Sequence, residues 1–153
     1  MARSRTGRTG RRDWARPAPP ALRLVLDAGA VLALSRNGVH ARATLKAALE
    51  VGADISIPAV VVAETVRGSG PRDATVNRVI NAVGEITVAD EVVARTAGGL
   101  LAAADAKATI DALVVADLVH QGGGVVLTGD PDDLTRLAAP HPDIVVRPLR
   151  EAG

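Results

Sequence analysis

Cysteine, phenylalanine and tyrosine are absent from this sequence of 153 residues, and Trp14 is its only aromatic residue. The absence of cysteine excludes disulfides, thiolate metal sites and cysteine nucleophiles. It is also compatible with a reducing cytoplasm, where disulfides are rare. Because 48% of the residues are hydrophobic, a sizeable core can form, and aliphatic side chains must fill it.

Long hydrophobic runs are also absent. The longest apolar runs, such as residues 59–63 and 113–116, are far too short to cross a bilayer. Residues 1–20 are basic but lack the apolar stretch of a secretory signal. The length fits one domain, because domains commonly contain about 100–200 residues. We therefore expect a single-domain, soluble protein of the cytoplasm that does not bind membranes.

The net charge of +1 conceals two regions of opposite charge. Residues 1–20, called the basic arm below, contain six arginines and one aspartate, whereas residues 21–153 contain 12 basic and 16 acidic residues. Such an arm can contact nucleic-acid phosphates. However, Pro17, Pro19 and Pro20 cannot lie inside a helix, and the arm has no apolar period. We therefore interpret it as a disordered extension of a domain at 21–153.

The domain alternates between two kinds of pattern. Short apolar runs predict five strands, at residues 22–26, 54–57, 85–88, 125–127 and 144–146. Helical patterns cover residues 29–35, 39–51, 59–67, 72–83, 90–104, 109–121 and 134–138. Apolar strands separated by helices predict a parallel α/β sheet that is covered on both faces. Sites in such sheets form beyond the carboxyl ends of strands, where the strand order reverses.

Four acidic residues adjoin apolar segments. Asp27 follows the first predicted strand, Asp130 follows the fourth, Glu64 follows the run 60–63, and Asp111 precedes the run 112–116. A carboxylate embedded among apolar residues needs a partner, water or a metal. Several carboxylates held together favour Mg²⁺ or Mn²⁺, because these hard cations prefer oxygen ligands. A site of this kind is typical of phosphodiester hydrolysis.

Each acid also has a purely structural interpretation. Asp27 can cap the helix that follows it, and Asp111 can complement the dipole at the start of its helix. Glu64 can pair with the arginine three residues later, and Asp130 can be an ordinary turn residue. The sequence decides neither between these interpretations nor whether the first and fourth strands are neighbours. Four such acids together favour the metal site.

Four segments resemble, in chain order, the acidic motifs of the PIN domain family. They are residues 24–30 (LVLDAGA), 57–67 (IPAVVVAETVR), 110–116 (IDALVVA) and 125–134 (VVLTGDPDDL). The resemblance extends over residues 22–147, and together with the chain length it points to the VapC toxins of VapBC toxin–antitoxin modules. It implies an α/β fold of three layers, in which helices flank a five-stranded parallel sheet ordered 3-2-1-4-5.

The resemblance also implies an endoribonuclease that depends on Mg²⁺ or Mn²⁺ and cuts RNA with a metal-activated water. The catalytic residues and metal ligands would be the four acids named above, Asp27, Glu64, Asp111 and Asp130. Thr128 would orient a carboxylate by a hydrogen bond. Further acids of the closing motif are candidates for the last ligand, and we rank them in the order Asp130, Asp133, Asp132.

The partners that the resemblance implies are an RNA substrate, a second copy of the chain and a VapB-type antitoxin. Such an antitoxin wraps the toxin and inserts a basic side chain into its acidic pocket, which fits the acidic balance of residues 21–153. The sequence departs from the family in its long basic arm and in Leu134, where an aromatic residue is common. With no aromatic residue after Trp14, stacking of RNA bases on the domain is in question.

Two other functions remain open at this point. One is a PIN fold that binds RNA or a partner without cutting. The other is a phosphate-transfer signalling domain in which Asp27 lies in an acidic pocket and Lys107 supplies the cation. We rank the second lower, because Lys107 does not follow a fifth strand as that arrangement requires.

Overall fold

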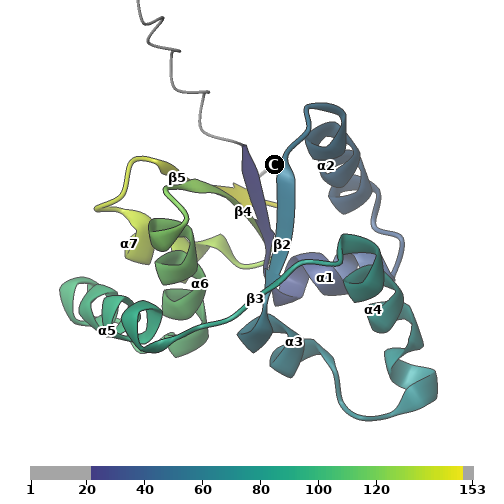
Figure 1. Ribbon diagram of the computed structural model, residues 1–153, viewed down its shortest axis with the longest axis horizontal. Helices are drawn as coiled ribbons and strands as arrows, with labels where there is room; N and C mark the ends of the chain where they lie inside the picture. Colours follow the sequence, from purple (N-terminus) through teal and green to yellow (C-terminus); the bar gives the residue numbers. More distant parts are fainter. Residues whose placement is uncertain (1–21, 150–153) are drawn as a thin grey trace, which may run out of the picture.

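The computed structural model describes residues 22–149, in which a parallel five-stranded sheet lies between two layers of helices (Figure 1). The prediction for the basic arm lies outside the described residues. The strand order β3-β2-β1-β4-β5 confirms the predicted topology. The strands are β1 (Arg23–Leu26), β2 (Asp54–Pro58), β3 (Ile86–Thr87), β4 (Gly124–Thr128) and β5 (Ile144–Pro148).

The two helical layers follow from the direction in which the chain crosses the sheet (Figure 1). From β1 to β3 the chain steps one way, through α1 (Ala28–Ser35), α2 (Val39–Glu50), α3 (Ala59–Thr65) and α4 (Gly70–Val83). From β3 to β5 it steps the other way, through α5 (Glu91–Ala104), α6 (Thr109–His120) and α7 (Pro131–Ala138). Because crossovers between parallel strands are right-handed, the two sets of helices cover opposite faces.

The neighbouring strands β1 and β4 mark the point where the strand order reverses. They pair in parallel over three positions, with Leu24 opposite Val125 and Leu26 opposite Leu127. Both strands are followed by residues that the sequence analysis selected, Asp27 and Asp130. The first and fourth strands are therefore neighbours, which the residues alone could not establish. Their pairing brings the loop after β1 and the loop after β4 to the same end of the sheet.

The core is aliphatic, as the composition requires. Central strands are buried on both faces, and one helix of the second layer contributes several buried side chains. The largest fully buried side chains include Leu26, Ile57, Val126 and Leu127 of the sheet and Val114, Val115 and Leu118 of α6. Each such side chain stabilises the fold by about 1.5–3 kcal/mol through removal of apolar surface from water.

Several predicted boundaries were wrong, two of them at proline. The helix predicted at 72–83 begins at Gly70, and the helix predicted at 134–138 begins at Pro131, because proline is well suited to the first helical turn. The strand predicted at 85–88 is only Ile86–Thr87. The helix predicted at 59–67 ends at Thr65, whose hydroxyl donates to the carbonyl of Val61 (3.0 Å). None of the helices within residues 22–149 is long and apolar enough to span a bilayer.

Asp73 organises the loop between α3 and α4. Its side chain is buried, and Oδ2 accepts the backbone N–H groups of Arg67 (2.9 Å), Gly68 (2.7 Å) and Ser69 (3.1 Å). The sequence analysis did not select this residue. A carboxylate that accepts three backbone N–H groups fixes the loop that leaves α3, and with it the position of Arg67.

We expect Asp73→Ala to lower the free energy of unfolding by about 1–3 kcal/mol, because three loop N–H groups lose their acceptor. Urea unfolding followed by circular dichroism measures this change. Asp132→Ala is the matched control, because Asp132 is an exposed aspartate in the first turn of α7. Equal stability of the two variants would show that the Asp73 hydrogen bonds do not stabilise the fold.

Candidate metal centre

Asp27 lies at the reversal point of the sheet, directly after β1. It caps α1, and its Oδ1 accepts the backbone N–H of Ala30 at 2.8 Å. The backbone N–H groups of Gly29 and Gly129 also donate toward its carboxylate. Burial raises the pKa of Asp27, and these hydrogen bonds offset part of that rise. Asp27 therefore caps α1 and also lies at the carboxyl end of β1, so the structural and the site interpretations both apply to it.

Thr128 ends β4 and is fully buried. Its hydroxyl oxygen accepts the backbone N–H of Asp130 at 2.9 Å and lies 3.0 Å from the carbonyl oxygen of the same residue. The hydroxyl also faces the Asp27 carboxylate and lowers its pKa. A hydroxyl carries a single proton, so it donates either to this carbonyl or to Asp27. Thr128 thus connects the loop after β4 to the acid after β1.

The absence of a side chain at Gly29 allows these two loops to touch at Gly129. A Cβ atom added at Gly29 would lie 2.8 Å from the backbone nitrogen of Gly129 and 3.0 Å from its Cα. Relieving such close contacts would require a shift of the backbone, which costs free energy of folding. A Cβ added at Gly129 would instead meet only ordinary contacts, at 3.4 Å and beyond. The sequence analysis missed both glycines, although each stands within two residues of an acid or Thr128.

Glu64 lies on α3, and its placement corrects one expectation. The apolar run before it predicted a carboxylate embedded among apolar residues, but Glu64 is exposed, because its run faces the core through other positions such as Val61. Partial desolvation raises the pKa of Glu64, repulsion from Asp27 adds to the rise, and Arg67 lowers it. The acid is therefore within electrostatic reach of Asp27 and Arg67.

Asp111 is the acid on which the other carboxylates converge. It lies half-buried in the first turn of α6. Desolvation is the largest cause that raises its pKa to about 6, and repulsion from four other acids adds to it. These acids are, in decreasing order of effect, Asp27, Asp133, Glu64 and Asp130. Four carboxylates from three separate segments thus act on one side chain.

The closing motif supplies two of these acids. Asp130 is exposed and occupies the N-cap position of α7, but its side chain makes no capping hydrogen bond. Asp133 is half-buried in the first turn of α7 and lies 3.6 Å from a guanidinium nitrogen of Arg136. Asp133 affects Asp111 more strongly than Asp130 does, and Asp132 is not among the acids that shift it. The side chains of Asp130 and Asp133 both remain candidates for the last ligand.

The donor set fits a divalent cation. All five acids that act on one another offer hard oxygen atoms, and their mutual repulsion is what a cation of two charges relieves. Among the described residues, Arg67 counters this charge through its effect on Glu64, and Arg136 does so beside Asp133. Within residues 22–149, no three of these acidic side chains lie close enough together to form a metal-binding group as they stand, so a cation would have to draw the carboxylates inward. Lys107, the cation of the signalling alternative, is not among the charges that shift Asp27, Glu64 or Asp111.

Asp117 is a further buried acid, which the sequence analysis also missed. Its Oδ2 accepts the Thr87 hydroxyl at 3.0 Å and the Gln121 amide at 2.7 Å. The Gln121 side chain in turn accepts a hydrogen bond from Arg23 at 3.2 Å. This chain of bonds ties α6 to β3 and to the start of β1. Asp117 is therefore occupied by structural bonds and does not join the carboxylates around Asp111.

Comparisons with known proteins identify the family and the fold. Residues 24–140 match the family model of the PIN domain. The chain belongs to the PIN domain family. The fold is similar to that of a chain in the structure of VapBC2 from Rickettsia felis bound to a promoter DNA fragment, with a TM-score of 0.67 and 12% identity, covering 83% of this chain and 98% of that one.

Two further structures share the PIN fold. A toxin–antitoxin complex from Klebsiella pneumoniae aligns with a TM-score of 0.62 and 18% identity, covering 80% of this chain and 95% of that one. FitAcB from Neisseria gonorrhoeae aligns with a TM-score of 0.58 and 20% identity, covering 81% and 96%. No curated protein has a significantly similar sequence. At these identities the structures support the fold of this PIN domain.

In metal-free protein we expect Asp111→Asn to stabilise the PIN domain at pH 7. The pKa of Asp111 rises from 3.8 unfolded to about 6 folded, so between about pH 4 and 6 the folded chain keeps a proton that the unfolded chain has lost. This favourable contribution is complete below pH 4 and is lost as the pH rises through 6. A shift of two units corresponds to about 3 kcal/mol. Solvent screening reduces the expected gain to about 1–2 kcal/mol.

Urea unfolding in EDTA at pH 4 and pH 7 measures this difference between the variant and the unaltered chain. The gain should appear at pH 7 and vanish at pH 4, while Asp132→Asn, a change at an exposed acid, should leave stability unaltered. A less stable Asp111→Asn variant at pH 7 would contradict repulsion at this position.

Substitution of the two glycines should have unequal effects. Gly29→Ala forces the loops after β1 and β4 apart, and we expect a loss of about 1–3 kcal/mol in stability and weaker binding of Mn²⁺. Gly129→Ala, the matched control, adds a methyl group where contacts are ordinary. Thermal unfolding and Mn²⁺ titration by calorimetry measure both effects. Equal behaviour of the two variants would mean that the contact at Gly29 does not position the acids.

Proposed function

We propose that this PIN domain is a divalent-cation-dependent endoribonuclease and acts as the toxin of a type II toxin–antitoxin pair. The observation that carries the proposal is the set of four carboxylates whose repulsion adds to desolvation, the larger cause, in raising the pKa of Asp111 to about 6. Together with Asp111, these acids come from four separate segments near the reversal point of the sheet, the position where α/β folds place their sites. Membership of the PIN family, whose members are typically nucleases, supports the same function.

The residues that would hold Mg²⁺ or Mn²⁺ are Asp27, Glu64 and Asp111, together with Asp130 or Asp133. A bound cation would neutralise the acids and supply Lewis acidity and water activation for hydrolysis of an RNA phosphodiester. Asp27 is the most rigidly held of these residues, because three backbone N–H groups and the Thr128 hydroxyl surround its carboxylate. Rigid placement of one ligand fixes the reaction centre relative to the sheet.

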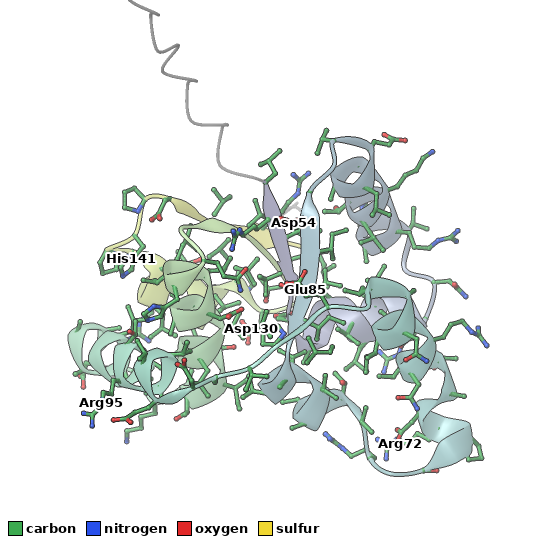
Figure 2. The ribbon with its side chains drawn as sticks, viewed as in Figure 1. Asp54, Arg72, Glu85, Arg95, Asp130 and His141 are labelled. Atoms are coloured by element: carbon green, nitrogen blue, oxygen red, sulfur yellow. The ribbon has the colours of Figure 1, made fainter. Side chains whose placement is uncertain are left out.

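Arg67 is our candidate for contact with an RNA phosphate. Its NH1 group donates to the carbonyls of Ala63 and Val66 (3.2 Å each), which leaves its other N–H donors free to bind a phosphate. In Figure 2, Arg72 lies on α4 and Arg95 on α5, both at the periphery and well away from Asp130. Arg95 also pairs with Glu91 at 2.8 Å, so neither is our candidate.

The proposal is tested by incubating purified protein with a pool of structured RNAs in Mg²⁺, Mn²⁺ or EDTA. We expect cleavage with either metal, none in EDTA, and loss of at least about a hundredfold in rate for Asp27→Asn, because a charged ligand becomes a neutral one. Asp54→Asn is the matched control, because Asp54 is the first residue of β2 and lies at the amino ends of the strands, opposite to the carboxyl ends where the acids gather. It should cleave as the unaltered protein does.

Other outcomes of this assay would argue against the nuclease. Cleavage that persists in EDTA or in Asp27→Asn would indicate a contaminating nuclease. Absence of cleavage by protein that binds Mn²⁺ in calorimetry would favour the alternative in which the PIN fold binds RNA or a partner without cutting.

We also propose an antitoxin as the protein partner and a homodimer as the assembly. Similar folds occur in a structure described as a toxin–antitoxin complex and in the structure of VapBC2. Both similarities support an antitoxin as the partner. The excess of acidic side chains at the proposed metal centre suits a partner that inserts a basic side chain there. Such a side chain would occupy the site that the cation needs, and the pair would then be inactive.

A further inference from the structure

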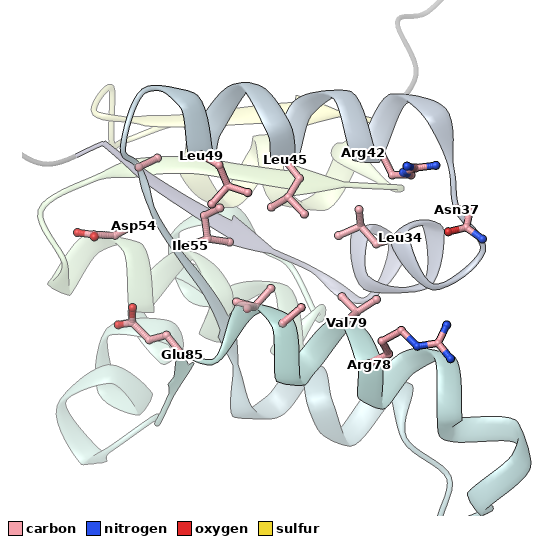
Figure 3. A pocket seen from close by; sticks show the side chains of 13 residues that line it. Leu34, Asn37, Arg42, Leu45, Leu49, Asp54, Ile55, Arg78, Val79 and Glu85 are labelled. Carbon is pink, nitrogen blue, oxygen red and sulfur yellow. The ribbon is translucent and has the colours of Figure 1, made fainter.

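An apolar groove of about 500 Å³ lies between α2 and α4, on the layer of helices that covers β2 (Figure 3). Its floor and walls include Leu45, Leu49, Ile55, Val79 and Val83. Leu49 has 61% of its surface exposed and lines the groove together with other apolar side chains. The groove contains none of the acids of the proposed metal centre. A volume of this size accepts a large side chain.

Charged side chains of opposite sign mark the two ends of this groove (Figure 3). Asp54 and Glu85 lie at one end, called the acidic end, and Arg42 and Arg78 lie toward the other, called the basic end. Within residues 22–149 none of these four side chains takes part in an ion pair. A segment with an apolar centre and opposite charges on its two sides would complement the groove.

The basic arm joins the domain beside the acidic end. The backbone N–H of Asp54 donates to the carbonyl of Leu22 at 2.8 Å, and Arg23 pairs with Asp54 in the sheet register. The chain that precedes Leu22 therefore starts next to Asp54, one of the two acids of that end. Any segment of the arm that folds back along α2 or α4 enters the groove from this side.

The arm contains one segment with the required chemistry, residues 13–16, in which Asp13 precedes Trp14 and Arg16 follows it. The chain from Trp14 to Leu22 advances eight residues, which reach about 26–29 Å when extended. The twelve residues of α2 extend only about 18 Å along the groove. Trp14 can therefore reach any part of the groove, with Arg16 on the side nearer the domain.

We propose that Trp14 docks into the α2–α4 groove of its own chain. Arg16 then pairs with the acidic end, and Asp13 faces the basic end. The indole covers the exposed Leu49 side chain and removes apolar surface of its own from water, which favours docking. Because the arm is tethered beside the groove, its effective concentration there is of the order of millimolar, so a weak contact is enough to hold it.

Fluorescence of the full-length chain tests this proposal directly, because Trp14 is the only tryptophan and there is no tyrosine. We expect its emission maximum at shorter wavelength than in the urea-unfolded chain, together with weaker quenching by acrylamide. Leu49→Asp places a charge in the groove at an exposed position and should shift the emission to longer wavelength and strengthen quenching. Circular dichroism checks that this variant remains folded.

The chain offers a matched control and a rescue. Val92→Asp changes a side chain with 57% exposure on α5, in the other helical layer, and should leave Trp14 emission unaltered. Glu85→Lys should release Trp14 in part, and the double variant Glu85→Lys with Arg16→Glu should restore the shorter wavelength. Restoration by charge exchange is a result that a general loss of structure cannot produce.

Three results would overturn the proposal. Emission and quenching equal to those of the unfolded chain would mean that Trp14 does not dock. Shielding that disappears on dilution would assign the groove to the arm of a second copy. Shielding that appears only when RNA is added would assign the arm to nucleic-acid contact.

Discussion

The parallel pairing of β1 with β4 is the interaction on which the rest of this structure depends. It is the point where the strand order reverses, and it forces the loop after β1 against the loop after β4. The backbone N–H of Asp27 continues this ladder by donating to the carbonyl of Leu127 at 3.2 Å. The two loops can touch because Gly29 carries no Cβ atom where it meets the backbone of Gly129. This contact positions Asp27 and Asp130, the acids that follow the two strands.

This arrangement opposes the stability of the fold. Asp27, Glu64 and Asp111 all have raised pKa values, with desolvation as the largest cause in each case, so their ionised forms are disfavoured in the folded chain. The buried aliphatic side chains of the central strands and α6 offset this cost. A group of acids that weakens its own fold is typical of residues kept for binding or catalysis. A divalent cation would reverse the sign of the effect by replacing repulsion with attraction.

Much of the fold followed from the sequence because it depends on patterns that are local. Five apolar runs separated by helical patterns predicted a parallel sheet, and the composition predicted a core without aromatic residues. Helix starts at Gly70 and Pro131 were missed, since proline indicates both a break and a first turn. The side-chain roles of Asp73 and Asp117 depend on hydrogen bonds to loops and elements that no local pattern describes.

The acids of the site could be selected one by one, but their convergence could not be derived from the residues. It depends on the strand order, which the residues left open and the family resemblance supplied. Glu64 shows the limit of an argument from apolar neighbours: the run before it packs against the core through other positions, and the carboxylate itself is exposed. The contact between Gly29 and Gly129 required coordinates, because two glycines a hundred residues apart leave no local signal.

The two edges of the sheet serve separate purposes in this interpretation. The carboxyl edge gathers the acids, whereas the other edge brings the start of β1 beside Asp54 and the acidic end of the α2–α4 groove. A segment docked in the groove would therefore leave the metal centre chemically unaltered, since the two share no residue. It would nevertheless compete with any protein that covers α2 and α4. The arm would then influence which partner the domain binds while its chemistry stays the same, a separation that follows from the opposite placement of the two surfaces.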